Sequence, residues 1–271
     1  MSGANEYAKT GNSDVDPKII KIGYSEVLNA LAEGFEDFWE KPSHNFFLYL
    51  VYPFIGFILI RWASTGDAFQ LIYPLIAGFA LIGPFAALGL YEISRRRELD
   101  LDTSWRHAFA VFRSPAIPSI LVIGILLLSL LLLWLSVSQG LYDRFYGPDE
   151  PSSFAILVSS LLTTSRGWNL LILGHLIGLG FALLVLATTS VALPLLIDRH
   201  CNALVAILVS LRVFITNPLP ILLWGVVVAI LLFIGSLPLF LGLAVVIPVL
   251  GHATWHLYRK TVARPVDRLI E

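Results

Sequence analysis

The chain has 271 residues, of which 57% are hydrophobic and 14% are charged, and its formal net charge is −1. Soluble domains carry roughly a quarter charged residues, so this composition excludes an ordinary water-soluble protein and indicates helices that cross a membrane. The charge balance gives no sign of a nucleic-acid partner, and a single cysteine, Cys201, excludes an intrachain disulfide framework and any multi-cysteine metal or iron–sulfur site.

Two segments precede the first apolar run. Residues 1–17 are polar and lack the apolar core of a cleaved signal peptide, and we expect a disordered cytoplasmic tail over 1–22. Residues 23–41 alternate apolar and acidic side chains at helical spacing, which predicts an amphipathic cytoplasmic helix. Because its polar face is acidic, we expect this helix to dock on the protein's own cytoplasmic surface near Arg95, Arg96 and Arg97, and not on anionic lipid.

Long uncharged runs fill most of the remaining chain, where a bilayer core takes about 20 residues of helix. The last run, Pro218 to His256, is too long for one crossing, and the breaker sequence GSLP near its middle divides it into two helices. The sequence therefore predicts an all-α polytopic protein with a six-helix membrane domain over 42–260 and a cytoplasmic tail over 261–271. The six transmembrane helices are expected at about 45–62, 70–93, 117–139, 169–197, 219–235 and 239–258.

Two shorter stretches between these spans are candidates for interfacial helices, which with residues 23–41 would make two or three on the cytoplasmic face. Asp102 to Ser114 has an N-cap in Asp102 or Thr103 and an apolar stripe that includes Trp105, so we expect it along the membrane interface. Asn202 to Thr216 is apolar nearly all round, and we expect it to pack beneath other helices.

Lysine and arginine orient the chain. Of the 18 Lys and Arg residues, a six-span bundle places Arg61, Arg144 and Arg166 on one side and the other 15 on the opposite side. The positive-inside rule then puts both termini in the cytoplasm, so we expect a bacterial inner-membrane protein whose first partner is the lipid bilayer.

A shift of 102 residues aligns two parts of the chain. The tetrapeptide GFAL occurs at 78–81 and at 180–183, and Pro118 aligns with Pro220. This register predicts an internal parallel repeat with units at about 70–139 and 172–236. Transporters and inert scaffolds both contain such repeats, so the repeat alone does not choose a function.

The stretch GHATWHLYRK, at 251–260, holds the residues that most resemble a ligand site. His252 and His256 are four apart, on one face of a helix, and with His200 they are candidate metal ligands. The favoured alternative is a membrane boundary, where Trp255 and Tyr258 form an aromatic belt. We therefore expect no metal or other cofactor, and eight anchors to lipid or to the interface: Arg95, Arg96, Arg97, Trp105, Trp255, Tyr258, Arg259 and Lys260.

Two ionisable residues lie in or beside the spans. His175 is flanked by Gly174 and Gly178 at the spacing that favours close helix packing, so we expect a neutral imidazole bonded to a neighbouring helix. Glu92 precedes the arginine triplet, which favours intrahelical pairing with Arg95 or Arg96. HExxH, GxSxG and phosphate-loop motifs are absent from the sequence, so we expect no catalytic residues.

Three stretches, at 73–98, 193–225 and 241–260, resemble the bacterial predicted integral membrane proteins of the domain-of-unknown-function family numbered 2189. They begin YPLIAGFALIGPFAALGLYEISRRRE, LPLLIDRHCNALVAILVSLRV and LGLAVVIPVLGHATWHLYRK, and the similarity covers most of the chain from about residue 40. The resemblance implies a multi-pass inner-membrane protein of unknown activity and carries over no functional residues.

Three functions fit this sequence. The first is a non-enzymatic scaffold or accessory component of a membrane complex, with other membrane-protein subunits as partners. The second is a channel or transporter for a small solute, motivated by the repeat and by proline and glycine within the spans. The third is a metal- or haem-binding membrane component, motivated by the histidines.

Overall fold

The computed structural model describes residues 17–40, 54, 57, 58, 61, 69–79, 83–147, 151, 153–199, 201–238 and 240–264. The named elements in these ranges are all helices, with no strand among them. The first predicted span, 45–62, and the predicted tail at 1–16 therefore lie almost wholly outside the described residues. The helices are α2 (Tyr24–Glu40), η1 (Phe69–Leu71), α4 (Ile72–Phe79), α5 (Gly83–Ala86), α6 (Leu88–Glu98), η3 (Trp105–Arg113), α7 (Ile117–Tyr146), α8 (Phe154–Thr163), α9 (Ser165–Thr189), α10 (Ala192–Arg199), α11 (Ala203–Thr216), α12 (Pro218–Ser236) and α13 (Leu243–Thr261).

Three helical segments of the described chain are long and apolar enough to cross a membrane: Ile117–Tyr146, Ser165–Arg199 and Pro218–Ser236. They coincide with the third, fourth and fifth predicted spans. The all-helical membrane class is thereby confirmed, whereas the number six stays a prediction. The sixth predicted span is helical as α13, but it does not satisfy the same length and composition test.

The second predicted span, 70–93, is not one helix. Its described residues form η1, α4, α5 and the beginning of α6. Pro74 and Pro84 each lie in the first turn of a short helix, where a missing N–H is tolerated, whereas either would break a longer one. The polar end of this stretch, α6, is folded into the protein, and Tyr91, Glu92 and Ser94 are buried there.

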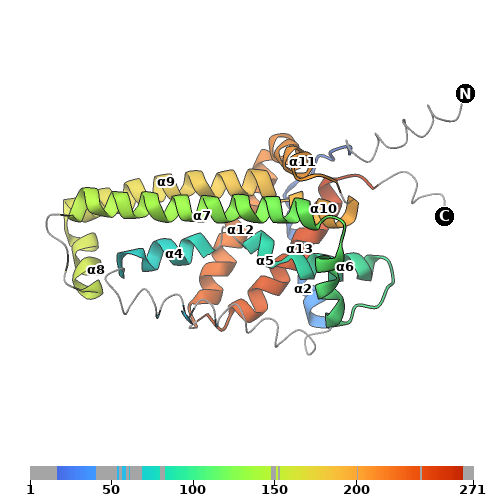
Figure 1. Ribbon diagram of the computed structural model, residues 1–271, viewed down its shortest axis with the longest axis horizontal. Helices are drawn as coiled ribbons and strands as arrows, with labels where there is room; N and C mark the ends of the chain where they lie inside the picture. Colours follow the sequence, from blue (N-terminus) through green and yellow to red (C-terminus); the bar gives the residue numbers. More distant parts are fainter. Residues whose placement is uncertain are drawn as a thin grey trace, which may run out of the picture.

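Figure 1 shows α7 and α9 side by side along the long axis of the molecule, with α8 at one end and α10 and α11 at the other. Trp134 of α7 joins the two long helices because its ring contacts Phe181 of α9 at a centroid distance of 5.6 Å. A Cβ at Gly178 would lie 3.1 Å from the same indole, so the glycine permits this close approach. At the far end, the Tyr146 hydroxyl of α7 bonds to Ser160 of α8 at 2.9 Å.

Helices α2 and α13 cross at very close range. A Cβ at Gly34 of α2 would lie 2.5 Å from the backbone nitrogen of Ala253 in α13, so only glycine fits there. Val27 and Ala30 complete the buried face of α2. The amphipathic helix expected over 23–41 is therefore present, docked on the protein itself.

The end of the predicted tail differs from expectation, because residues 17–22 are hydrogen bonded to the C-terminal strand-like segment. Ile19 and Val262 form an antiparallel bridge, and the Ile20 N–H donates to the Thr261 carbonyl at 2.8 Å. The side-chain oxygen of Asn217 also accepts from the Ile22 N–H at 2.8 Å. Residues 17–22 are thus paired with the end of α13 and with the start of α12.

The two stretches between spans are both helical. The first is a 3₁₀ helix, η3, with Ser104 at its N-cap, while the Asp102 carboxylate accepts from the Ser104 N–H. In the second, α11, Ala206 and Val209 are buried but Leu204 is exposed, so one face of it is uncovered. The internal repeat stays a prediction.

Candidate functional site

A polar cluster gathers where α2, α6 and α13 meet, and we call it the α2 clasp. Most of its residues line a cavity of ≈ 440 Å³. Acidic side chains come from α2, and basic or neutral polar ones come from α6 and α13. The clasp consists of Glu33, Asp37, Glu40, Ser94, Arg97, His252, His256 and Lys260.

Ion pairs connect the acidic side of α2 to both neighbouring helices. Arg97 lies 3.0 Å from the Asp37 carboxylate and also pairs with Glu40. Lys260 donates to Glu33 at 2.7 Å. The docking that the sequence predicts near the arginine triplet therefore occurs at Arg97, and further contacts come from Lys260 and the histidines of α13.

His256 lies between two carboxylates. Its Nε2 is 2.9 Å from Asp37 Oδ2, and its Nδ1 is 3.2 Å from Glu33 Oε2. A neutral imidazole has one N–H to donate, whereas an imidazolium has two. The ring can therefore serve both carboxylates only in its protonated form.

Asp37 is the centre of the clasp, with a side chain that is only 9% exposed. Burial raises the pKa of this carboxyl, but the hydrogen bond from His256, the Arg97 charge and the two histidines when protonated outweigh it, so the pKa lies below its usual value. The hydroxyl of Ser94 lies 2.7 Å from His252 Nδ1 and 3.4 Å from Asp37. Asp37 thus stays ionised because three helices supply it with partners.

A second polar cluster adjoins the clasp, and we call it the Arg259 cluster. The Arg259 guanidinium donates two hydrogen bonds to Asp198 of α10, at 2.8 and 2.9 Å, and one to Glu98 of α6 at 2.7 Å. The same guanidinium stacks over the Trp255 ring at 4.7 Å. Tyr258 donates to Asp198 at 2.7 Å, so the buried carboxylate is fully engaged.

These contacts place most of the eight predicted anchors inside the protein. Trp255 and Tyr258 are 1% and 0% exposed, so neither side chain reaches lipid from this position. The following pair, Arg259 and Lys260, bonds to acidic groups of neighbouring helices. Of the arginine triplet, Arg97 is held in the clasp and the other two pair with Glu92, as the sequence favours. Trp105 is the first residue of η3.

The candidate metal ligands have a different role in this arrangement. His252 and His256 are both turned toward Asp37. In the ranges that the structure describes, no group of three or more His, Cys, Asp or Glu residues is arranged to hold a metal ion. His200 lies outside those ranges. The described geometry therefore offers no support for the metal or haem interpretation.

The side chains of α2 that point away from the clasp form an apolar stripe. Leu28, Phe35 and Trp39 are exposed, the last two by 50% and 68%, and their rings stack at 6.0 Å. The small pair Ala30 and Gly34, four residues apart, is buried instead, and this spacing was the sequence signal that could have identified the true docking face.

Polar side chains within the apolar part of the molecule bond to one another. The Tyr73 hydroxyl lies 2.9 Å from His175 Nε2, and His175 Nδ1 lies 2.7 Å from the Leu171 carbonyl. A neutral ring that donates from Nδ1 and accepts at Nε2 satisfies both contacts, which is the arrangement expected for this histidine. Gln70 and Gln139 form a similar pair at 3.0 Å.

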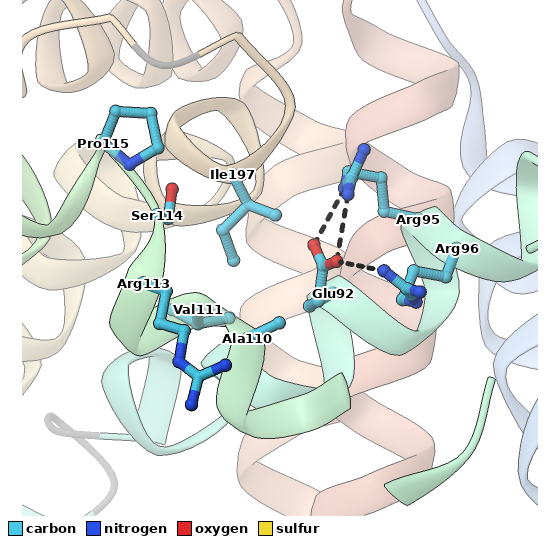
Figure 2. A pocket seen from close by; sticks show the side chains of 9 residues that line it. All are labelled: Glu92, Arg95, Arg96, Ala110, Val111, Arg113, Ser114, Pro115 and Ile197. Carbon is cyan, nitrogen blue, oxygen red and sulfur yellow. Dashed lines mark hydrogen bonds and ion pairs between the residues drawn. The ribbon is translucent and has the colours of Figure 1, made fainter. Parts of the chain in front are cut away.

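A second cavity, of ≈ 230 Å³, opens beside α6, η3 and the start of α7. Figure 2 shows Glu92 bonded to Arg95 and Arg96 on one side, with Arg113 of η3 on another. Arg113 is not among the predicted site residues, because nothing in the local sequence pattern indicates that η3 packs against α6.

Comparisons with known proteins bear on the class of this protein. The model of a family described as "Predicted integral membrane protein (DUF2189)" matches residues 72–198, which run from α4 to α10. The match contains Arg97, Glu98 and Asp198 but neither α2 nor α13. No curated protein and no solved structure matches the chain. Together with the three membrane-length helices of the described ranges, the match indicates an integral membrane protein in contact with the lipid bilayer, whose segment 72–198 is similar to the DUF2189 family.

Proposed function

We propose that this protein is a non-enzymatic component of a membrane complex and that the outer stripe of α2 binds a second membrane-protein subunit. The observation that carries the proposal is the combination of a firmly held helix with an uncovered apolar face. The clasp fixes α2 through Glu33, Asp37 and Glu40, while Phe35 and Trp39 remain exposed.

Such a face has the properties of a protein-binding surface. Exposed aromatic patches rimmed by polar residues mark interaction sites, and tryptophan is enriched among the residues that dominate binding energy. The stripe of Leu28, Phe35 and Trp39 is rimmed by exposed Asn29 and Glu36. A helix that is already fixed loses little conformational entropy on binding, which favours affinity.

The proposal includes a location and an orientation. We place the protein in a bacterial inner membrane with both termini in the cytoplasm, because lysine and arginine are concentrated on that side of the predicted bundle. The clasp and the stripe would then face the cytoplasm, where a partner subunit could reach α2 from the side.

The test is purification of the complex after mild detergent extraction. The wild-type protein is expected to bring down a second polypeptide in fixed ratio. Phe35→Ala combined with Trp39→Ala should release it, since each aromatic truncation at the centre of an interface costs about 2 kcal/mol, roughly 30-fold in affinity. Phe233→Ala is the matched control, because Phe233 of α12 is 66% exposed and lies outside the stripe.

A photo-reactive phenylalanine analogue at position 35 identifies the occupant directly. One discrete protein adduct is expected. A wild-type protein that purifies as a clean monomer, or adducts formed with lipid alone, would contradict a partner-binding role for α2.

A further inference from the structure

The residues that line the cavity beside α6, η3 and α7 carry a net positive charge. The residues that line it include three arginines and one glutamate, an excess of two positive charges around a space of ≈ 230 Å³. Its lining residues are Glu92, Arg95, Arg96, Ala110, Val111, Arg113, Ser114, Pro115 and Ile197. Figure 2 shows the single carboxylate held toward α6, away from the η3 wall.

The arginines differ in how far they are already occupied. Arg95 donates from Nε and a terminal nitrogen to Glu92 at 2.8 and 2.9 Å, which neutralises this carboxylate. Arg96 lies 3.6 Å from the same carboxylate, and its Nε donates a hydrogen bond to the Asp102 carbonyl. Arg113 is exposed and makes no ion pair or side-chain hydrogen bond with the part of the chain that the structure describes. Its guanidinium can therefore receive an anion, and Arg96 can add the terminal nitrogen that does not pair with Glu92.

The cavity lies beside the first residues of a membrane-length helix. Phe112, which precedes Arg113, is 70% exposed and stacks with the exposed Phe109 at 6.3 Å. The membrane-length helix α7 begins only four residues after Arg113, and its exposed apolar surface starts at Leu121. Arginines at the end of a spanning helix, beside aromatic rings that favour lipid, match the depth of phospholipid headgroups.

We propose that this cavity binds the phosphate of an anionic phospholipid, with Arg113 and Arg96 as its hydrogen-bond donors. Guanidinium groups bind phosphate oxygens in bidentate fashion, and the positive end of the α7 dipole adds to the attraction. The excess positive charge selects a lipid of net negative charge, because a zwitterionic headgroup carries a cation of its own into the same space. Phe109 and Phe112 contact the acyl chains.

The experiment measures lipid retention and protection on the full chain in detergent. Native mass spectrometry should show bound phosphatidylglycerol but not phosphatidylcholine, and added phosphatidylglycerol should raise the thermal unfolding midpoint. Arg113→Gln is expected to weaken this binding about tenfold, since it removes a charge-assisted hydrogen bond. Arg106→Gln, an exposed arginine of the same η3 helix that does not line the cavity, should leave it unchanged.

Two further arms separate the site from general electrostatic attraction. Arg113→Lys keeps the charge and should retain most of the preference for phosphatidylglycerol over phosphatidylcholine, which also shows that position 113 tolerates substitution. Equal losses in the Arg106 and Arg113 variants would overturn the proposal. So would protection by inorganic phosphate that matches protection by phosphatidylglycerol, because the ligand would then be a free anion.

Discussion

At the scale of single residues, Asp37 is the central residue of the α2 clasp. Its carboxylate pairs with Arg97 of α6 and His256 of α13, and its side chain is nearly buried. Removing one member of a buried ion-pair network leaves the other charges without compensation, and that penalty usually exceeds the net contribution of the pair itself. Asp37 therefore holds together three helices that are far apart in the sequence.

Asp37→Asn is expected to destabilise the protein by about 3 kcal/mol near neutral pH, because Arg97 and His256 lose their common counter-ion. Thermal unfolding in detergent, followed by tryptophan fluorescence, measures the loss. Glu36→Gln is the matched control: Glu36 is an exposed carboxylate of the same helix, and its substitution should change stability by less than about 0.5 kcal/mol.

The same variant gives the pH dependence of the clasp. Asp37 has a folded-state pKa below its usual 3.8, so its contribution to stability is present above that pH and disappears as the pH falls through the lower, folded-state value. The stability difference between the wild type and Asp37→Asn should therefore be present at pH 5 and should narrow as the pH falls below about 4. A gap of the same size at pH 5 and at pH 2 would show that Asp37 acts through packing and not through its charge.

At the scale of helices, the crossing of α2 over α13 depends on one small side chain. Gly34 lies against the backbone of Ala253, where no side chain can move aside. The crossing brings Glu33 and Asp37 within reach of Lys260 and His256, so close packing and ion pairing reinforce each other.

Gly34→Ala should therefore push α2 away from α13, although alanine is the better helix former by about 1 kcal/mol. Faster hydrogen exchange over residues 24–40 and a lower unfolding midpoint are the expected results. Gly140→Ala in α7 is the control, since a Cβ there meets nothing within 4 Å and should be neutral or slightly stabilising. Unchanged exchange in α2 would contradict the close crossing.

Apolar periodicity and run length predicted helices such as α2, α7, α9 and α12 because these features depend only on neighbouring residues. They could not predict which face of α2 is buried, since that depends on Gly34 meeting Ala253, more than 200 residues away. The two clusters were missed for the same reason. Asp198 and Arg259 lie in separate helices, so no local sequence pattern predicts their pairing.

The local sequence pattern around Trp255 and Tyr258 predicts a membrane boundary, whereas the structure buries both rings. Trp255 and Tyr258 precede Arg259 and Lys260 as they would at a membrane boundary, and this order says nothing about which way the rings point. Glu98 and Asp198 turn both rings inward by accepting their hydrogen bonds. A boundary signature and a buried polar cluster can thus share one sequence.

At the scale of the whole molecule, the two ends of the chain restrict how it can be threaded. Lys18 accepts from the Ala263 N–H, and Ile20 donates to Thr261. Segments paired in this way lie on the same side of a bilayer, so the number of crossings between them must be even. The described ranges hold three helical segments that are long and apolar enough to cross a membrane, an odd number, so we expect at least one more crossing, for which α13 is one candidate.

This parity can be measured in cells. Green fluorescent protein fused to either end should be fluorescent, as it is in the cytoplasm, and alkaline phosphatase fused to either end should be inactive. In a Cys201→Ser background, Ser153→Cys beyond the far end of α7 should react with a membrane-impermeant maleimide in intact cells. Asp100→Cys, before η3, should react only after permeabilisation, because α7 separates the two positions. Opposite results for the two termini would break the pairing of Ile19 with Val262 and, with it, the even number of crossings.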